Sequence, residues 1–393
     1  KKLKFHPSIN MTKGKIINII ANLISIEVDG KVGQNEICFV LRGDSILRSE
    51  VIKVVGNTAF AQVFESTRGV RIGDEVEFSG HLLEIELGPG ILSQNFDGLQ
   101  NNLDKLDGTF LERGVFSEPL DIERKYRFKA IAKVGDTLEA GSWLGEVQEN
   151  MIPHKIMVPF NFKGYFKVKS IEGDKDLAIR DTVAVLEDED GKTVDVNMVQ
   201  KWPVKIPIHV HNSKPRPFRI LQTGMRVIDT LNPITEGGTG FIPGPFGTGK
   251  TVLQHAIAKN GDADIIIVTA CGERANEVVE IFTEFPHLID PRTGRTLQER
   301  TSIVCNTSSM PVSSREASVY VGMTIAEYYR AMGLKVLLLA DSTSRWAQAL
   351  REMSNRLEEL PGPDAFPVDL PAIIANFYAR AGFVYLKNGE SGS

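Results

Sequence analysis

The sequence predicts a multidomain protein with a small N-terminal β-barrel, an all-β insertion and an α/β nucleotide-binding domain. Three observations predict this fold class. Short apolar runs separated by turn residues, without helical periodicity, extend from Lys13 to about Gly80. A second all-β pattern occupies residues 108–200. From Ile220 onward, apolar strands alternate with helical patterns, which is typical of a mostly parallel sheet.

Length and composition are those of an ordinary globular protein. The 393 residues suggest roughly two to three domains, and 42% of them are hydrophobic. No run approaches the roughly 20 apolar residues of a membrane helix, and no signal peptide is recognisable. The net charge of −5 argues against a chain dominated by nucleic-acid binding. The basic residues 1–10 are interpreted as a tail.

The cysteine pattern predicts neither a disulfide framework nor a zinc site. Cys38, Cys271 and Cys305 are far apart and odd in number. Because Cys271 and Cys305 end apolar runs, we expect their thiols to be buried. Free thiols are consistent with a reducing cytoplasm.

Residues 11–82 are predicted to form the barrel. Even spacing and turn dipeptides such as Asp29-Gly30 favour a closed barrel of short strands, with a structural and assembly role. The predicted strands are residues 16–20, 23–28, 36–41, 50–55, 58–64 and 75–78.

Residues 108–200 are predicted to be an all-β insertion, with residues 83–107 as a connector. The Gly135-Asp136 turn and the pattern that follows it resemble the flattened barrel of biotinyl and lipoyl carrier domains. A carrier needs a lysine at an exposed hairpin tip. The nearest candidate, Lys155, lacks the sequence setting of those families, so a structural role is favoured.

A phosphate-binding loop of the form G-x-x-x-x-G-K-[ST] lies at residues 244–251. Glycines let backbone N–H groups surround a phosphate, and the helix that follows offers its positive N-terminal end. The lysine reaches the β- and γ-phosphates and the final hydroxyl ligates Mg²⁺. The predicted nucleotide-binding residues are Gly244, Pro245, Phe246, Gly247, Thr248, Gly249, Lys250 and Thr251.

The flanking segments fit such a loop. Thr239–Pro243 is predicted to be a short buried strand, and residues 251–259 a helix closed by Asn260-Gly261. With residues 83–107, residues 201–393 form the predicted nucleotide-binding domain. Its strands are predicted at 264–270, 301–305 and 335–341, and its helices at 274–285, 346–360 and from Ser313 or Ser314, as the cap, to Met332.

Two carboxylates complete the predicted site. Asp341 ends an apolar strand, so it is placed to orient metal-bound water beside Thr251. Glu273 follows another strand, at the edge where open α/β sheets bind ligands, and is predicted to polarise the attacking water. Arg274 is predicted to stabilise charge or tether Glu273. The alternative for Glu273 is a carboxylate that merely favours the helix N-terminus.

These motifs resemble the catalytic A subunits of V/A-type rotary ATPases. The resemblance covers about residues 13–393 and includes the insertion, which looks like that family's bulge domain. It implies that Glu273 activates water with Arg274 as its partner, that Arg345 lies near the γ-phosphate and that Glu277 lies near the metal. The motifs are residues 244–251, 270–277, 306–311, 340–349 and 377–382.

The resemblance also implies a function and partners. We expect Mg²⁺-dependent ATP hydrolysis or synthesis coupled to proton or sodium translocation, at interfaces with non-catalytic B subunits in an A₃B₃ hexamer. Central and peripheral stalks and, indirectly, a membrane rotor would complete the complex, on the cytoplasmic face of a membrane and without nucleic acid. Family members continue past Ser393 into a helical C-terminal domain, so the sequence is interpreted as truncated.

Two alternatives stay open at this point. A hexameric nucleic-acid motor, such as an RNA translocase, also joins a barrel to a phosphate-loop domain, but the barrel region offers few aromatic residues for stacking. A sister subunit that binds nucleotide without turnover would lack the loop lysine or the activating glutamate. Lys250 and Glu273 are both present.

Overall fold

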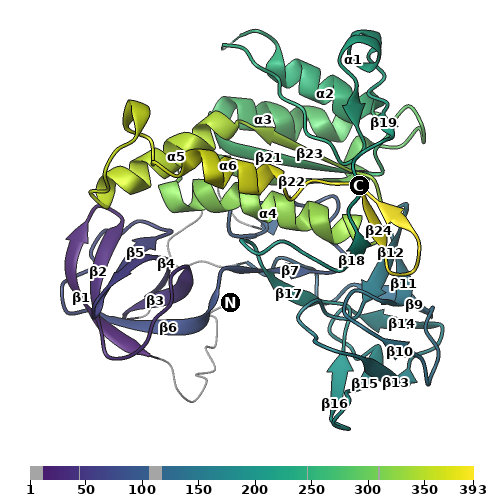
Figure 1. Ribbon diagram of the computed structural model, residues 1–393, viewed down its shortest axis with the longest axis horizontal. Coiled ribbons are helices and arrows are strands. Elements are labelled where there is room, and N and C mark those ends of the chain that lie inside the picture. Colours follow the sequence, from purple (N-terminus) through teal and green to yellow (C-terminus); the bar gives the residue numbers. More distant parts are fainter. Residues whose placement is uncertain (1–11, 44, 106–116, 246, 309) are drawn as a thin grey trace.

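The computed structural model has three parts, a β-barrel, a β-sandwich and an α/β domain, which are visible side by side in Figure 1. It describes residues 12–43, 45–105, 117–245, 247–308 and 310–393.

The N-terminal part is a closed six-stranded barrel with strand order β1-β2-β5-β4-β3-β6. Its interior is filled by alternate side chains of each strand, such as Ile24 and Ile26 of β2, and by Cys38. Cys271 and Cys305 are buried, as predicted. The predicted barrel is confirmed. Its strands are β1 (Lys13–Ile20), β2 (Leu23–Val28), β3 (Glu36–Arg42), β4 (Ser45–Val55), β5 (Thr58–Val63) and β6 (Glu75–Leu82).

The insertion is a sandwich of two four-stranded sheets, with strand orders β10-β13-β15-β16 and β12-β11-β9-β14. Strands β7 (Glu84–Leu87) and β17 (Gln200–Pro203) pair antiparallel where the chain enters and leaves this part. The sandwich strands are β9 (Lys125–Ala130), β10 (Thr137–Leu138), β11 (Trp143–Glu149), β12 (Ile152–Met157), β13 (Phe166–Ile171), β14 (Lys175–Ala178), β15 (Ala184–Glu187) and β16 (Thr193–Val196).

Lys155 has none of the features of a carrier lysine. It lies inside β12, where its ammonium is 2.6 Å from Glu146 Oε2 and 5.0 Å from the ring centre of Trp143. Its side chain is only 16% exposed. A carrier lysine must leave the surface to reach its partner enzymes, so these contacts favour the structural role.

The nucleotide-binding domain is built on a parallel four-stranded sheet of order β23-β21-β22-β8. Its strands are β8 (Asn95–Phe96), β21 (Ile265–Glu273), β22 (Thr301–Thr307) and β23 (Val336–Asp341), and its helices are α1 (Arg226–Leu231), α2 (Lys250–Asn260), α3 (Ala275–Glu284), α4 (Val312–Arg330), α5 (Thr343–Arg356) and α6 (Leu370–Tyr378). Short strands around it are β18 (His211–Ser213), β19 (Ile220–Leu221), β20 (Ile234–Thr235), β24 (Val384–Leu386) and β25 (Ser391–Gly392). Single 3₁₀ turns lie at Leu103–Lys105, Phe285–His287, Leu297–Arg300 and Pro363–Ala365.

Two local expectations are wrong. Thr239–Pro243 is not a strand: it is largely exposed, and the Phe241 side chain is 76% exposed. Because Gly240 has no side chain to bury and Pro243 no N–H to donate, little favours sheet pairing of this segment. Helix α4 is not capped by a serine side chain, since its N-cap is Pro311. The two serine hydroxyls are engaged elsewhere: Ser313 donates to the Val63 carbonyl, and Ser314 accepts from Asn306.

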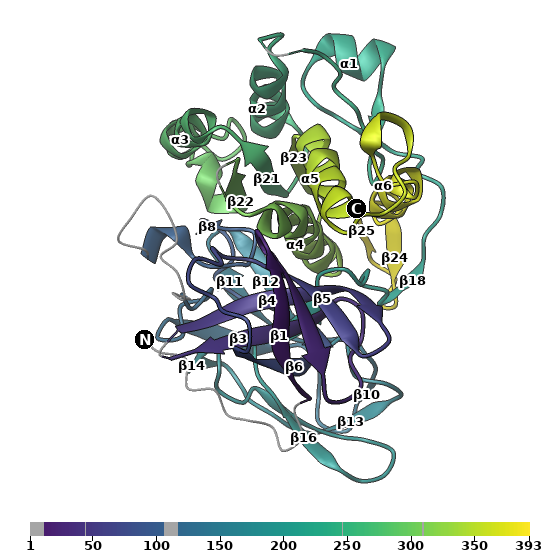
Figure 2. The same cartoon turned by 90° about the vertical axis from the view of Figure 1, so that its left-hand side faces the viewer.

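Helix α4 is the central packing element. It lies between the parallel sheet and the two β-domains, as Figures 1 and 2 show, and every residue in it except Tyr320 is buried. The sandwich contacts its C-terminal half through a fully buried network that the sequence did not reveal. His154 Nδ1 lies 2.6 Å from Glu149 Oε2, and its Nε2 lies 2.8 Å from the Tyr328 hydroxyl.

We expect Gly322→Ala to destabilise the fold. A Cβ at Gly322 of α4 would lie 2.1 Å from Thr269 Oγ1 and 3.3 Å from Thr269 Cβ on strand β21. Alanine gains about 1 kcal/mol in helix propensity, but overpacking of a dense core costs about 1–3 kcal/mol, and here the central strand must move. Urea unfolding should show a net loss. Gly173→Ala, at an exposed position with no atom within 4 Å of the added Cβ, is the control. Equal stability of the two variants would contradict this close packing.

Candidate nucleotide site

The phosphate loop leads directly into α2. Gly249 is the N-cap of this helix with φ of 83°, and Gly247 has φ of 80°, values that favour glycine. The Thr248 hydroxyl donates to the Pro245 carbonyl at 2.8 Å, which closes the loop on itself. Phe246 lies outside the described residues.

Lys250 is held against the loop. Its ammonium donates to the carbonyls of Gly244 and Pro245 at 2.7 and 2.8 Å. Both hydrogen bonds are local and at the surface, so a phosphate oxygen can compete for the same ammonium without disturbing the core. The helix N-terminus and the lysine charge thus lie together at the mouth of the loop.

Parallel register brings the predicted carboxylates to one edge of the sheet. Asp341 of β23 pairs with Ala270 of β21, and Glu273 ends β21 three residues later. The Thr251 hydroxyl, from the first turn of α2, donates to Asp341 Oδ2 at 3.1 Å. Residues distant in sequence, Thr251 and Asp341, therefore meet beside Glu273.

The carboxylate cluster resists ionisation. Burial, a hydrogen bond that protonated Glu273 donates to Glu277, and the charge of Asp341 raise the pKa of Glu273 to about 8. The positive charge of Arg345 opposes this rise. Burial also raises the pKa of Asp341, although its hydrogen bond from Thr251 works in the other direction. Raised carboxyl pKa values of this kind are typical of a site that binds a cation, because a bound cation would stabilise the ionised carboxylates.

The two predicted arginines are placed differently. Arg345, in the first turn of α5, is partly buried and packs beside Gly272, next to Glu273. Arg274 is the N-cap of α3 and its side chain is exposed. The charge of Arg345 lowers the pKa of Glu273.

Arg315 is a further residue at the site, and sequence reasoning missed it. It is 8% exposed, and its Cδ would lie 3.1 Å from a Cβ at Gly272. Its guanidinium donates to Glu352 of α5 at 3.2 Å. The one sequence feature that could have indicated Arg315 is its position shortly after the motif 306–311. This motif lies beside the site, because the Ser308 N–H donates to the Glu273 carbonyl at 2.9 Å. Spacing alone does not show that the helix following this motif turns Arg315 toward Gly272.

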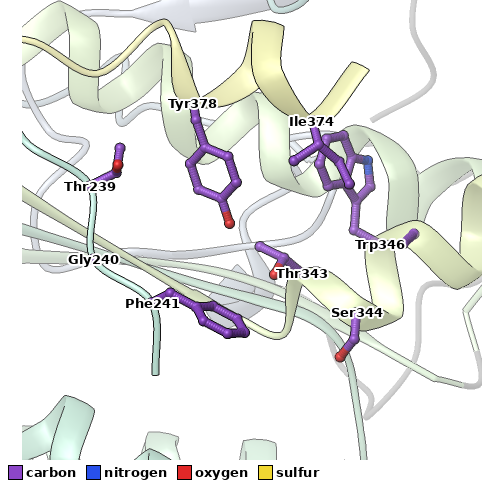
Figure 3. Close-up of a pocket in the computed structure, with 9 residues that line it drawn as sticks. Thr239, Gly240, Phe241, Thr343, Ser344, Trp346, Ile374 and Tyr378 are labelled. Carbon is purple, nitrogen blue, oxygen red and sulfur yellow. The ribbon is translucent and has the colours of Figure 1, made fainter. Parts of the chain in front are cut away.

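A cavity of about 410 Å³ opens beside the first turn of α5, the turn that carries Arg345. In Figure 3 the ring of Tyr378 points from α6 toward Phe241, the exposed residue just before the phosphate loop. No charged side chain lines the cavity, so phosphate binding belongs to the loop and not to this space. Its lining residues are Thr239, Gly240, Phe241, Thr343, Ser344, Trp346, Ala347, Ile374 and Tyr378.

Comparison with known proteins agrees with this architecture. Three family models match in order: the ATP synthase alpha/beta family β-barrel domain at residues 16–80, the alpha/beta subunit barrel-sandwich domain at 117–205 and the family's nucleotide-binding domain at 224–393. The V-type ATP synthase alpha chain of Borreliella afzelii is 54% identical over 97% of this chain and 67% of its own length. The chain belongs to the family of V-type ATP synthase alpha chains.

A second relative supports the same membership. The V-type ATP synthase alpha chain of Treponema denticola is 56% identical over 97% of this chain and 65% of its own length. The chain thus spans about two thirds of the length of these relatives. Membership confirms the predicted fold class, the prediction of a rotary-ATPase catalytic subunit that hydrolyses or makes ATP, and its place in a complex with other subunits. Nothing in the comparisons supports a nucleic-acid motor, and the predicted domain boundaries stay predictions.

Within the described parts of the chain, we find no helix long and apolar enough to cross a membrane.

Proposed function

We propose that Glu273 orients and polarises the water that attacks the γ-phosphate of ATP. The observation that carries this proposal is the meeting of Glu273, Asp341 and Thr251 at one sheet edge, directly beside the phosphate loop. A carboxylate can accept the proton of an attacking water only where it is close to the phosphate and not neutralised by a salt bridge. Burial and the neighbouring carboxyl groups of Glu277 and Asp341 raise the pKa of Glu273 more than the charge of Arg345 lowers it, so the basicity of Glu273 is high.

The phosphate loop would hold the β- and γ-phosphates. Backbone N–H groups of Gly247 to Thr251 and the N-terminus of α2 provide donors, and Lys250 provides the positive charge. Transfer of Lys250 from two carbonyls of its own loop to the phosphates would leave those carbonyls at the surface, where water can satisfy them. Arg345 and, from the exposed side, Arg274 would add positive charge as negative charge spreads over the γ-phosphoryl oxygens.

The donor set beside the loop fits Mg²⁺. Hydroxyl and carboxylate oxygens are the ligands that this hard cation prefers, and it usually takes its other ligands from water and from phosphates. No group of three or more His, Cys, Asp or Glu able to hold a metal occurs among the described residues, which agrees with a metal that arrives with the nucleotide. Thr251 would ligate the ion, Asp341 would orient its water, and Glu277 would add negative charge nearby. When bound, Mg²⁺ neutralises charge on the phosphates.

The complex would supply what this chain lacks. We propose non-catalytic B subunits as the partners in an A₃B₃ hexamer, central and peripheral stalks around it, and a cytoplasmic position at a membrane whose rotor moves protons or sodium ions. Support comes from the family membership and from the phosphate loop, which is exposed at the surface of the chain. An arginine donated by the neighbouring subunit typically contributes ~10³–10⁵ to the rate in phosphate-loop enzymes, so the isolated chain should be a poor ATPase.

The test is the Mg²⁺ dependence of Asp341→Asn in the full-length subunit assembled with its partner. Asparagine can still accept from Thr251 but carries no charge, so the Mg²⁺ concentration for half-maximal ATP turnover should rise by roughly 10–100-fold. Asp176→Asn, an exposed carboxylate of the sandwich, is the matched control. An Asp341→Asn enzyme with the wild-type Mg²⁺ requirement would contradict the proposed metal position.

A further inference from the structure

Two buried carboxylates and a partly buried lysine join the barrel to the nucleotide-binding domain, away from the nucleotide site. Lys205, just after β17, has its ammonium 2.8 Å from Glu50 Oε1 of barrel strand β4 and 3.4 Å from Glu316 Oε1 of α4. It also donates to Asn35 Oδ1 at 3.3 Å. Glu50 and Glu316 are each 4% exposed. Three segments distant in sequence thus meet at one ammonium ion, where Figures 1 and 2 show α4 passing over the barrel.

The cluster holds one negative charge too many. Two carboxylates face one ammonium, and a buried charge without a partner is costly. Within the described part of the chain, Glu316 Oε2 has no hydrogen-bond partner, and neither does the amide group of Gln62, which lies opposite Glu50 across β4 and β5. The junction therefore contains polar atoms without hydrogen-bond partners and one excess negative charge, which a single proton would neutralise.

We propose that Glu50, Lys205 and Glu316 form a protonation-controlled lock between the barrel and α4, which tightens when Glu316 takes up a proton.

The geometry assigns the proton to Glu316. Glu50 is the closer partner of Lys205, by 2.8 Å against 3.4 Å, and therefore keeps the ion pair. Burial and the charge of Glu50 raise the pKa of Glu316 to about 7, even with Lys205 nearby. The lysine stays charged: burial works against its ammonium, but Glu316 and Glu50 outweigh this and raise the pKa of Lys205.

Other titratable groups around the cluster stay neutral near pH 7. Burial, and next the charge of Glu316, raise the pKa of Tyr320, one turn along α4. Burial, and next the charges of Glu36 and Glu50, raise the pKa of the Cys38 thiol on β3. Burial also raises the pKa of the Cys271 thiol on β21, and the charge of Glu316 adds to this effect. Because these groups neither gain nor lose a proton near pH 7, Glu316 is the group whose titration changes the charge of the cluster there.

The lock bears on the nucleotide site through α4. Glu316 is the neighbour of Arg315, which packs beside Gly272 and donates to Glu352. Because α4 is buried along its length, stronger binding of Glu316 at the junction limits how far the end of β21, at Gly272 and Glu273, can move. The stability of the barrel junction and the position of α4 would thus depend on pH. The residue responsible, Glu316, does not contact the nucleotide.

The sign of the pH effect follows from the proton count. Glu316 binds its proton more tightly in the closed junction than in an opened one, where the ordinary value of 4.5 applies. Opening therefore releases a proton. The closed junction is most stable at pH values below the ordinary glutamate pKa of 4.5, and it becomes less stable as pH rises toward about 7. We expect the local opening equilibrium of wild type to increase on the order of tenfold or more between about pH 5.5 and about pH 7.5.

Hydrogen exchange of the whole chain, corrected for the intrinsic pH dependence of exchange, tests the lock. In wild type, peptides from β4, β5 and α4 should exchange faster at the higher pH. In Glu316→Gln, whose side chain is always neutral, these peptides should be equally protected at both values. Glu27→Gln, the same change at an exposed position of barrel strand β2, should behave as wild type. Equal protection of wild type at both pH values, or unchanged pH dependence in Glu316→Gln, would overturn the lock.

A second variant covers the case in which Glu316→Gln fails to fold. Glu50→Gln leaves Glu316 as the one carboxylate of the cluster, so Glu316 should pair with Lys205 and stay ionised. The pH dependence of exchange should then disappear over the same range. Infrared difference spectra give an independent measurement when both proteins also carry Glu273→Gln, which removes the other carboxyl whose pKa lies near this range. The protein with Glu50 intact should lose the carbonyl band of a protonated carboxyl as pH rises through about 7, and the protein with Glu50→Gln should lack this change. Persistence of the band change in Glu50→Gln would refute the shared cluster, whatever the activity of the complex.

Discussion

Glu273→Gln is expected to reduce ATP turnover by about 10²–10⁴-fold in the assembled complex while nucleotide binding stays within a few fold of wild type. Glutamine has nearly the shape of glutamate and can still hydrogen-bond to Glu277 and to water. It cannot accept a proton from the attacking water. Loss of turnover without loss of binding is the signature of an interaction needed only in the transition state. Turnover and equilibrium binding of a fluorescent ATP analogue measure the two quantities.

Glu277→Gln separates this role from general charge at the site. It removes the neighbouring carboxylate from α3, so the pKa of Glu273 should fall and turnover should drop less than in Glu273→Gln. The opposite order, with Glu277→Gln the slower enzyme, would transfer the water-activating role to Glu277.

The pH profile provides a further check on the base. Because Glu273 has a pKa of about 8 in the free chain and acts as a carboxylate, kcat/KM should fall as pH decreases through that value. The acid limb should be absent from the residual activity of Glu273→Gln. A limb that persists unchanged in the variant would belong to another group.

The local pattern of apolar, polar and turn residues predicted the barrel strands and the strands of the parallel sheet. The barrel strands alternate apolar and polar residues between turn residues, and strands β21, β22 and β23 are short apolar runs, so their identity is encoded within a few residues. The placement of Glu273 and Asp341 followed from the rule that parallel strands end at one edge. The phosphate loop followed from its glycines and Lys250.

Tertiary context decided the rest. Thr239–Pro243 has a strand-like sequence, yet a strand exists only where a neighbouring backbone accepts it. His154 had no local mark of a core residue, because its partners Tyr328 and Glu149 come from another domain and another strand. Arg315 and the cluster at Lys205 were missed for the same reason. Charged residues in a sequence are expected at the surface, and only the packing of α4 against the parallel sheet and the two β-domains shows that Arg315, Glu50 and Glu316 are buried.

Lys250→Ala is expected to weaken nucleotide binding roughly 10–100-fold, since a charge-assisted hydrogen bond to phosphate contributes about 1.5–3 kcal/mol. Turnover at saturating nucleotide should fall by a further ~10² or more, because the lysine also meets the negative charge that develops in the transition state. The fold should be unaffected, because the hydrogen bonds of this ammonium to described residues go to carbonyls of its own exposed loop.

Two further variants make the Lys250 result specific. Lys259→Ala removes the same charge from the last turn of the same helix α2 and should leave both quantities near wild type. Lys250→Arg keeps the charge but not the shape. The planar guanidinium is too large for a loop whose glycines let the backbone approach the phosphate, so arginine should recover little of the turnover. Full recovery by arginine would mean that charge near the loop is sufficient, and that the close fit of Lys250 to Gly244 and Pro245 has no part in phosphate binding.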